Sequence, residues 1–210
     1  MLEDIALHAQ FSADQIGKNA IGASVMAAIG RVARHEFVPA ELRPYAYLDT
    51  PLPIGAGKTI SQPFMVALMV DLLDLAPGHK VLEIGTGLVY QSAVLGQLGA
   101  RVFSIEIMEE LSSEAGRRLR EQDAGDIELR LGDGAQGWPD HAPFDRIIVA
   151  AAPELMPPAL FGQLKPGGRM VIPAGIEGEQ ELLIVEKDEA GIISTRPVMR
   201  VVFAPFVVSH

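Results

Sequence analysis

The sequence contains no cysteine and few aromatic residues, which make up 6% of its 210 positions. The absence of cysteine excludes a disulfide framework, a thiolate nucleophile and any cysteine-ligated metal. Basic residues are also scarce, since 17 lysines and arginines stand against 27 acidic residues and leave a formal net charge of −10. Because a polyanion repels phosphate backbones, we expect no nucleic-acid partner.

A long apolar run is missing as well. The most apolar stretch, 64–75, is interrupted by Asp71 and Asp74, whereas a bilayer-spanning helix needs about 18 uninterrupted apolar residues. The segment 1–10 carries two acidic side chains and does not look like a secretory signal or a transit peptide. The five histidines show no HxxxH or HxH spacing, so no metal site is expected. These absences favour a soluble, cytoplasmic protein without a membrane partner.

What the sequence does contain is a regular alternation of apolar runs and helical segments after residue 76. With 49% hydrophobic residues, the chain can bury a substantial core in one domain. Strands that alternate with helices indicate an α/β doubly wound sheet that is mostly parallel. The last two strands are joined by a connection too short for a crossover helix, so that pair is predicted to be antiparallel. Strands are predicted at 81–84, 102–105, 127–131, 146–150, 170–173, 182–186 and 198–203, and helices at 90–98 and 109–122.

The N-terminal part of the chain differs in character from this sheet. Residues 21–34 are amphipathic and predicted to be helical, and another helix is predicted to start at Pro63 with Ser61 as its cap. Between them, 51–63 is too rich in glycine and proline for regular structure, and such a loop is either a connector or a lid over a site. The predicted organisation is one domain, 1–210, with an N-terminal helical extension and lid loop in 1–75 and a cofactor-binding sheet in 76–210.

A glycine turn, 83–87, directly follows the first strand of the sheet and directly precedes a helix. Gly85 and Gly87 permit a tight turn and a close approach of the backbone to a ligand, and the helix N-terminus beyond them offers free N–H groups. Taken alone, such a glycine pair is also compatible with an ordinary strand-to-helix turn.

Acidic residues follow the next two strands. Glu106 lies 21 residues after Gly85, where a carboxylate can accept hydrogen bonds from both ribose hydroxyls of a nucleoside. Asp133 follows the third strand and could reach an adenine amino group. Because open α/β sheets bind ligands at the carboxyl ends of their strands, the three features together predict a nucleoside cofactor. Dinucleotide cofactors usually require GxGxxG, and Tyr90 at the sixth position favours an adenosyl cofactor instead.

The motifs TISQP (59–63) and PLPIG (51–55) resemble those of protein-L-isoaspartate O-methyltransferases. Both are specific to that family, whereas the glycine turn is shared by many methyltransferases. Further matches cover most of 30–206 in the right order. They are AYLD (46–49), VLEIGTG (81–87), GDG (132–134), GW (137–138), APFD (142–145), AAP (151–153), GGR (167–169) and VFAP (202–205).

The resemblance implies a Rossmann-like methyltransferase sheet with an antiparallel last strand. It also implies transfer of a methyl group from S-adenosylmethionine to the carboxylate of an L-isoaspartyl residue in a damaged protein, so that isoaspartyl-containing peptides or proteins would be the partners. Ser61 matches the family's active-site serine. The neighbouring residues expected to bind substrate are Lys58, Thr59 and Ile60, and the positions expected to bind the cofactor are Glu83, Gly85, Thr86, Gly87, Glu106, Asp133 and Gly134.

The implied reaction makes few demands on the side chains. A carboxylate is already ionised at pH 7, so it needs no general base, and the methyl group of a sulfonium is already activated. The protein must supply in-line alignment and exclusion of water, which suits a lid formed by 51–63 with Ser61 and loop N–H groups orienting the carboxylate.

Two departures from the family's motifs leave the exact activity open. Val89 replaces the third glycine of the turn; a valine there either adds bulk against the ligand or is tolerated because φ is negative. Lys58 replaces a glutamine and either contacts a substrate carboxylate or points into solvent. A divergent relative acting on another substrate or reaction, and a non-catalytic binding module, therefore remain alternatives.

Other charged groups are expected to lie on the surface. A small basic cluster that includes Arg34, His35 and Arg43 precedes the loop, and Arg117 and Arg118 lie on a strongly charged helix. Solvation is the expected role of both groups.

Overall fold

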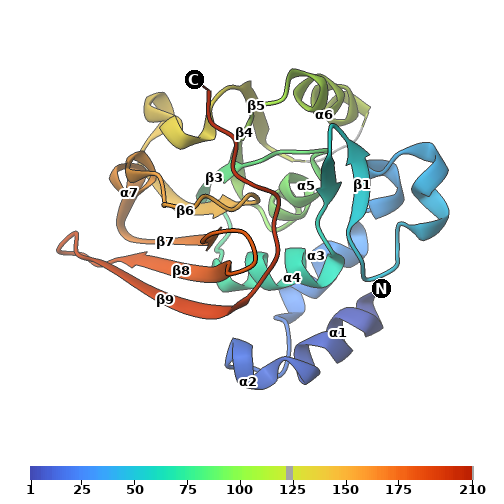
Figure 1. The fold of residues 1–210 in the computed structure, drawn as a ribbon, viewed down its shortest axis with the longest axis horizontal. Helices are drawn as coiled ribbons and strands as arrows, with labels where there is room; N and C mark the ends of the chain where they lie inside the picture. Colours follow the sequence, from blue (N-terminus) through green and yellow to red (C-terminus); the bar gives the residue numbers. More distant parts are fainter. Residues whose placement is uncertain (122–124, 210) are drawn as a thin grey trace.

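The computed structural model describes residues 1–121 and 125–209 and has a central sheet of seven strands (Figure 1). The strand order is β5-β4-β3-β6-β7-β8-β9. The last residue of the predicted helix 109–122 lies outside the described residues. The strands are β3 Lys80–Ile84, β4 Arg101–Glu106, β5 Ile127–Leu131, β6 Phe144–Val149, β7 Leu164–Ala174, β8 Glu181–Lys187 and β9 Ile193–Arg200.

The pairing of the strands confirms the mostly parallel sheet. β3 to β7 pair in parallel, whereas β8 is antiparallel to both β7 and β9. The last pair is thus antiparallel as predicted, and β8 is the strand that runs opposite to its neighbours. β9 begins earlier than predicted and contains Pro197, which pairs with Leu183. Because β9 is an edge strand, the missing N–H of a proline is tolerated there.

Helices cover both faces of the sheet, as the doubly wound prediction requires. Alternate residues of each strand point to opposite faces, so Val81 and Val102 enter one core while Leu82 and Phe103 enter the other. The first face carries α3 to α6, with α1 packed on α4, and the second carries α7. The helices are α1 Leu2–Phe11, α2 Ala13–Ile16, α3 Ala23–Arg31, α4 Pro63–Leu72, α5 Tyr90–Gln97, α6 Glu109–Glu121 and α7 Pro158–Gln163, with short 3-10 turns at Arg34–Phe37, Ala40–Tyr45, Gly134–Gln136 and Pro139–His141.

The segment 51–63 is more regular than its composition predicts. β1 (Leu52–Gly55) and β2 (Lys58–Ile60) form an antiparallel hairpin beside the main sheet, so the prediction of no regular structure is wrong for these residues (Figure 1). Three consecutive residues with positive φ, at 55–57, make the tight turn between the strands. Leu52 pairs with Ile60, and both side chains are buried, which anchors the hairpin to the core.

The start of α4 also differs from its prediction. Pro63 occupies the first turn as expected, but Gln62 rather than Ser61 is the N-cap residue, and its side chain makes no capping bond. The N–H of Phe64 instead donates to Oδ1 of Asp49 at 2.8 Å. A carboxylate from a distant segment therefore caps the helix, which leaves the Ser61 side chain available for other contacts.

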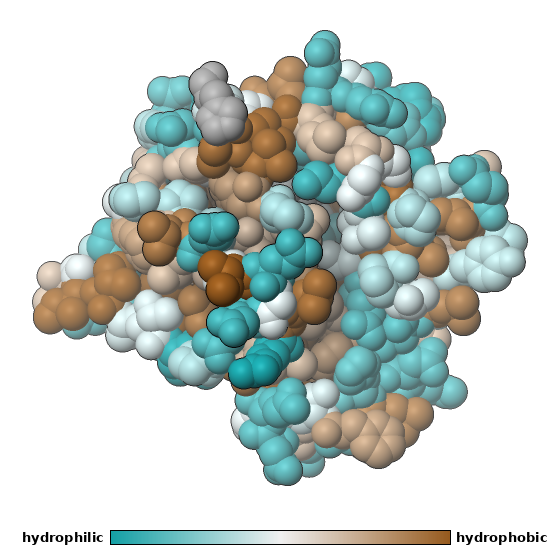
Figure 2. Space-filling model, viewed as in Figure 1, coloured by the Kyte–Doolittle hydropathy of each residue, from teal (hydrophilic) through white to brown (hydrophobic). Residues whose placement is uncertain are grey.

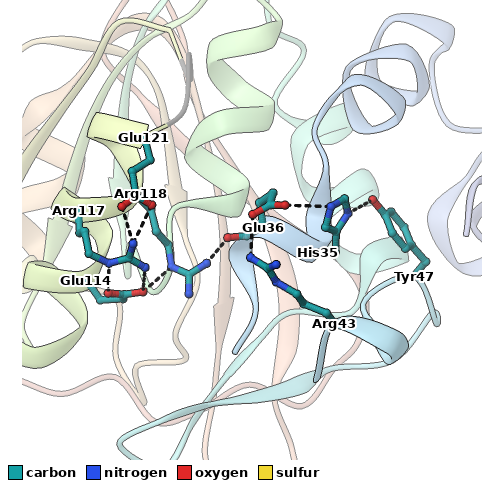
Figure 3. Close-up of polar contacts among 8 residues, drawn as sticks. All are labelled: His35, Glu36, Arg43, Tyr47, Glu114, Arg117, Arg118 and Glu121. Atoms are coloured by element: carbon teal, nitrogen blue, oxygen red, sulfur yellow. Dashed lines mark hydrogen bonds and ion pairs between the residues drawn. The ribbon is translucent and has the colours of Figure 1, made fainter. Parts of the chain in front are cut away.

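A polar network joins α6 to the N-terminal part of the chain (Figure 3). Arg118 is 9% exposed and donates to the main-chain carbonyl of Glu36 and, at 2.9 Å, to Glu114. The Glu36 carboxylate in turn accepts from Arg43 at 2.9 Å. The expectation that Arg118 faces water is therefore wrong, whereas Arg117 stays about half exposed beside Glu114.

The surface facing the viewer in Figure 2 mixes hydrophilic and hydrophobic residues, and the tip of the hairpin that joins β8 and β9 is apolar, with Ile192 66% exposed. Within residues 1–121 and 125–209, every helix is too short or too polar to cross a membrane. The same residues contain no cluster of three side chains that could hold a metal ion.

Candidate active site

A cavity of about 820 Å³ opens at the carboxyl ends of β3, β4 and β6. Its floor includes Gly85, Glu106 and Ala150, which directly follow or end these strands. The β1–β2 hairpin forms one wall and the segment 199–207 forms another, and the surface is hollowed between them (Figure 2). This is the edge at which open α/β sheets bind ligands, so the cavity is the candidate active site.

The glycine turn adopts a backbone that requires its glycines. Gly85 and Gly87 have φ values of +91° and +55°, a region that side chains strongly disfavour. The Gly85 N–H donates to the Ile105 carbonyl at 2.8 Å, which ties the turn to β4. A Cβ added at Gly134 would lie 2.2 Å from Cγ2 of Ile84. The floor of the cavity is thus shaped by positions where only glycine fits.

The Glu106 carboxylate lines the cavity and is only 6% exposed as a residue. One oxygen accepts the Gly87 N–H at 2.9 Å and the other accepts the Met108 N–H at 3.0 Å. Each carboxylate oxygen has a further lone pair, so hydroxyl groups of a ligand can still donate to it. The two backbone bonds fix the carboxylate in position before any ligand arrives.

Glu83 lies behind the turn rather than in the cavity wall. It is fully buried, and its carboxylate accepts from Gln91 at 2.9 Å, from Ser104 at 2.7 Å and from Ser92. Ser104 Oγ lies 2.6 Å from Thr86 Oγ1, which links this cluster to the turn. Burial raises the pKa of the Glu83 carboxyl, partly offset by these hydrogen bonds. The structure therefore places Glu83 outside the cavity lining, where it is linked to the turn through Ser104 and Thr86.

Asp133 also lies outside the cavity lining, although its neighbour Gly134 belongs to it. One Asp133 oxygen accepts the Ala135 N–H at 2.8 Å. The other accepts the N–H and the hydroxyl of Ser209, at 3.1 and 3.0 Å. Ser209 of the C-terminal segment thus donates two hydrogen bonds to the carboxylate that was predicted to reach an adenine amino group.

The same C-terminal segment is held against the sheet by main-chain bonds. The Ala152 N–H donates to the Ala204 carbonyl at 2.9 Å, and the Phe206 N–H donates to the Ala152 carbonyl at 3.0 Å. Nζ of Lys58, on the hairpin, lies 3.5 Å from the Pro205 carbonyl. The hairpin and the C-terminal segment therefore meet across the cavity.

The predicted substrate residues of the hairpin and its continuation all line the cavity, namely Lys58, Thr59, Ile60 and Ser61. The Ser61 carbonyl accepts from Nη2 of Arg34 at 2.7 Å, and Nε of Arg34 donates to the Ala46 carbonyl at 3.0 Å. Arg34 is fully buried, so its expected surface position is wrong. Its guanidinium lies 4.7 Å from the centroid of the Tyr90 ring. Nothing in the sequence distinguishes this buried arginine from its exposed neighbours.

Tyr90 and His8 also line the cavity and were not predicted as site residues. Burial raises the pKa of Tyr90 to about 12, so the phenol keeps its proton at neutral pH. Tyr90 could have been found from its place beside the glycine turn. His8 is distant in sequence from every other lining residue, and the sequence carried no signal for it.

Val89 does not line the cavity, although it belongs to the glycine turn. Its φ is +74° with ψ near 0°, and its side chain is fully buried. The interpretation that valine is tolerated because φ is negative is therefore wrong. The side chain is accommodated in the core at the cost of a left-handed backbone, and it adds no bulk to the ligand cavity.

Comparisons with known proteins agree with this geometry. Protein-L-isoaspartate O-methyltransferase 1 from Polaromonas sp. is 53% identical over 204 residues, which is 97% of this chain and 86% of that protein. A solved protein-L-isoaspartate O-methyltransferase superimposes with a TM-score of 0.82 at 25% identity over 98% of this chain and 65% of that one. A Plasmodium falciparum protein described as a protein-L-isoaspartate O-methyltransferase, in complex with S-adenosyl-L-homocysteine, superimposes with a TM-score of 0.77 at 20% identity over 96% and 98% of the two chains.

The family comparison extends over nearly the whole chain. The sequence model of the protein-L-isoaspartate(D-aspartate) O-methyltransferases matches residues 13–210. Together with the 53% identity to the Polaromonas protein, this match shows that the chain belongs to the protein-L-isoaspartate(D-aspartate) O-methyltransferase family.

Proposed function

We propose that this protein transfers a methyl group from S-adenosylmethionine to the carboxylate of L-isoaspartyl residues in damaged peptides and proteins. The proposal rests on one observation. In this chain, which belongs to the family, a single cavity is lined by the glycine turn, by Glu106 and by the segment 58–61 that ends at Ser61. A nucleoside site and a second binding segment in one cavity are what a methyl transfer between two bound molecules requires.

The cofactor would be held by the residues around the glycine turn. The backbone of Gly85, Thr86, Gly87 and Gly134 would border its chain and nucleoside, and Glu106 would accept from the ribose hydroxyls. Ser209 takes both lone pairs of Asp133 Oδ2, so Asp133 would accept from the adenine amino group with the lone pair of Oδ1 that Ala135 leaves free. Glu83 would act indirectly, through Ser104 and the turn.

The chemistry of this proposal rests on positioning. S-adenosylmethionine supplies a methyl group that needs no further activation when it is bound. The substrate carboxylate is ionised at neutral pH, so no side chain has to remove a proton. Ser61 and the main-chain N–H groups beside it would orient one carboxylate oxygen, and Arg34 would hold this segment through the Ser61 carbonyl. The hairpin and the segment 199–207 would exclude water from the space between them.

The alternative of a divergent activity is not favoured. It rested on Val89, whose side chain lies in the core rather than in the cavity. Retention of Glu106 and Ser61 in the cavity wall likewise argues against a binding module that has lost catalysis. Since the chain carries a net charge of −10, its polypeptide substrates rather than nucleic acids would be the partners, and we place the reaction in the cytoplasm.

Labelled S-adenosylmethionine and a matched pair of peptides test this proposal. The peptides are identical except that one contains isoaspartate and the other aspartate at the same position. We expect base-labile label on the isoaspartyl peptide alone, because a methyl ester is base-labile and an N-methyl group is not. Equal labelling of both peptides, or of neither while the protein is folded and binds S-adenosylhomocysteine, would refute the proposed function.

A further inference from the structure

Helix α1 contributes one residue, His8, to the lining of the cavity. His8 lies on α1, which precedes residue 13, where the family match begins. It lines the cavity together with Ser61, Phe64 and Val201. His8 stacks on Phe64, and its ring lies close to Gln62; both of these residues follow Ser61 in the chain. His8 therefore lies beside the segment expected to bind the polypeptide substrate.

His8 is held firmly although its side chain is 38% exposed. Its ring stacks on Phe64, with the centroids 4.0 Å apart and the planes within 6°. Nδ1 lies 3.0 Å from Oδ2 of Asp49, whose side chain is 12% exposed. The same oxygen accepts from Nε2 of Gln62 at 3.1 Å. Gln62 and Phe64, which follow Ser61 in the chain, thus each contact both His8 and Asp49.

These contacts leave one polar atom of the ring for a ligand. A carboxylate can only accept, so the 3.0 Å contact with Asp49 places the hydrogen on Nδ1 of His8. The Gln62 amide nitrogen, 3.4 Å from the same atom, then donates to Asp49 and not to the ring. Among residues 1–121 and 125–209, Nε2 has no hydrogen-bond partner. The ring is therefore oriented by a carboxylate and an aromatic face, while its second nitrogen stays open beside the cavity.

We propose that His8 contacts the substrate, with Nε2 hydrogen-bonding to the main chain of the polypeptide next to the isoaspartyl residue. A main-chain amide offers both a donor and an acceptor, so it suits Nε2 in either protonation state of the ring. The inference rests on the proposed function, and it makes α1, outside the family match, a part of the peptide site. Asp49 is then a positioning residue, because it acts through His8.

Two substitutions separate substrate contact from a merely structural role. In His8→Asn the amide lies near the place of Nδ1, so it keeps the bond to Asp49 and lacks an atom at Nε2. In His8→Gln the longer amide reaches the place of Nε2. The matched control is Gln10→Ala, an exposed position on the same helix that does not line the cavity. Steady-state methylation of an isoaspartyl hexapeptide and its affinity in the presence of S-adenosylhomocysteine are measured for each variant.

We expect His8→Asn to raise the peptide KM and Kd about fivefold to tenfold, the range for one lost hydrogen bond. We expect kcat and the S-adenosylhomocysteine Kd to change less than about twofold, and His8→Gln and Gln10→Ala to stay near the wild type. If His8→Asn binds the peptide as tightly as the wild type while His8→Gln binds it more weakly, the role of His8 is to hold Asp49 and the proposal is overturned. Unchanged peptide KM and Kd in every variant would also overturn it.

The outcome also distinguishes this inference from the proposed function. If the wild type binds the isoaspartyl peptide in a His8-dependent way but transfers no methyl group, the contact stands and the methyltransferase proposal fails. If the wild type methylates the peptide with no dependence on His8, only the contact fails. A wild type that does not bind the peptide would overturn both.

Discussion

Val89 provides a test of backbone strain in the glycine turn. It has φ of +74° and a fully buried side chain. A residue with a Cβ pays about 1–2 kcal/mol in the left-handed region, whereas glycine costs about 0.5–1 kcal/mol more unfolded-state entropy than alanine. Glycine also lacks the buried Cβ that alanine keeps, which is worth about 0.8 kcal/mol. The strain is therefore isolated by making the same glycine and alanine substitutions at a buried site with a negative φ. We expect the stability of the glycine variant relative to the alanine variant to be about 1–2 kcal/mol more favourable at position 89 than at that site.

Val94 is the matched control, because it is equally buried and lies inside α5. There glycine relieves no strain, so Val94→Gly should be less stable than Val94→Ala by at least about 1 kcal/mol, the ordinary helix-interior penalty for glycine. For a domain of this size 1 kcal/mol corresponds to about 2–4 °C in Tm. We therefore expect the Tm of the glycine variant relative to the alanine variant to be about 2–8 °C higher at position 89 than at position 94.

Thermal unfolding followed by circular dichroism at one pH measures all four variants. An equal Tm difference between the glycine and alanine variants at positions 89 and 94 would refute the strained backbone. The S-adenosylhomocysteine Kd of Val89→Gly provides a second readout, and we expect it to stay within about threefold of the wild type because Val89 does not line the cavity. A tenfold weaker Kd would mean that the valine shapes the ligand site after all.

Four further predictions concern the other residues of the site. Glu106→Gln removes a charged acceptor and should raise the S-adenosylhomocysteine Kd about tenfold, the value of one charge-assisted hydrogen bond; an unchanged Kd by calorimetry would contradict its role. Ser61→Ala should lower kcat/KM for the isoaspartyl peptide at least about tenfold without changing that Kd, whereas equal losses in both would indicate a collapsed loop. Lys58→Gln should change kcat/KM less than about threefold, because the contact of Lys58 with the Pro205 carbonyl is long, 3.5 Å. A tenfold loss would mean that Lys58 contacts the substrate. Burial raises the pKa of Glu83, so its contribution to stability is present below the unfolded-state pKa and is lost as pH rises through the native one. The Tm of Glu83→Gln relative to the wild type should accordingly increase from about pH 5 to about pH 8, and a decrease would refute the sign.

The sheet could be predicted from the sequence because its signals are local. The apolar runs of β3 and β4, each followed by a helix, identify parallel strands, and the glycine turn shows which end carries the site. The hairpin of β1 and β2 could not be predicted in the same way. Its glycines indicate a break, yet Leu52 and Ile60 become a pair only through burial against the core, which is a tertiary effect.

The site residues likewise fall into those that local sequence signals predict and those that depend on tertiary contacts. Glu106 was predictable because its spacing from Gly85 follows from the length of one strand–helix–strand unit. Arg34 and His8 were not, because their positions depend on long-range contacts with Ser61 and Asp49 that no short pattern encodes. The backbone of Val89 was not predictable either. Its positive φ is imposed by the turn between β3 and α5, and the valine side chain argues against it.

The cavity wall combines the first helix of the chain with one of its last segments, since both α1 and 199–207 line it. A ligand that binds only when both segments are docked shifts the equilibrium toward the docked form by an amount set by its concentration and Kd. Local opening of either segment must then become rarer as the site is filled, even though the two are nearly 200 positions apart. Hydrogen exchange at the amides of α1 and of 201–207 should therefore slow together when S-adenosylhomocysteine and an isoaspartyl peptide are added together. Release of these ligands and local opening of the two outer segments are then coupled steps of one equilibrium.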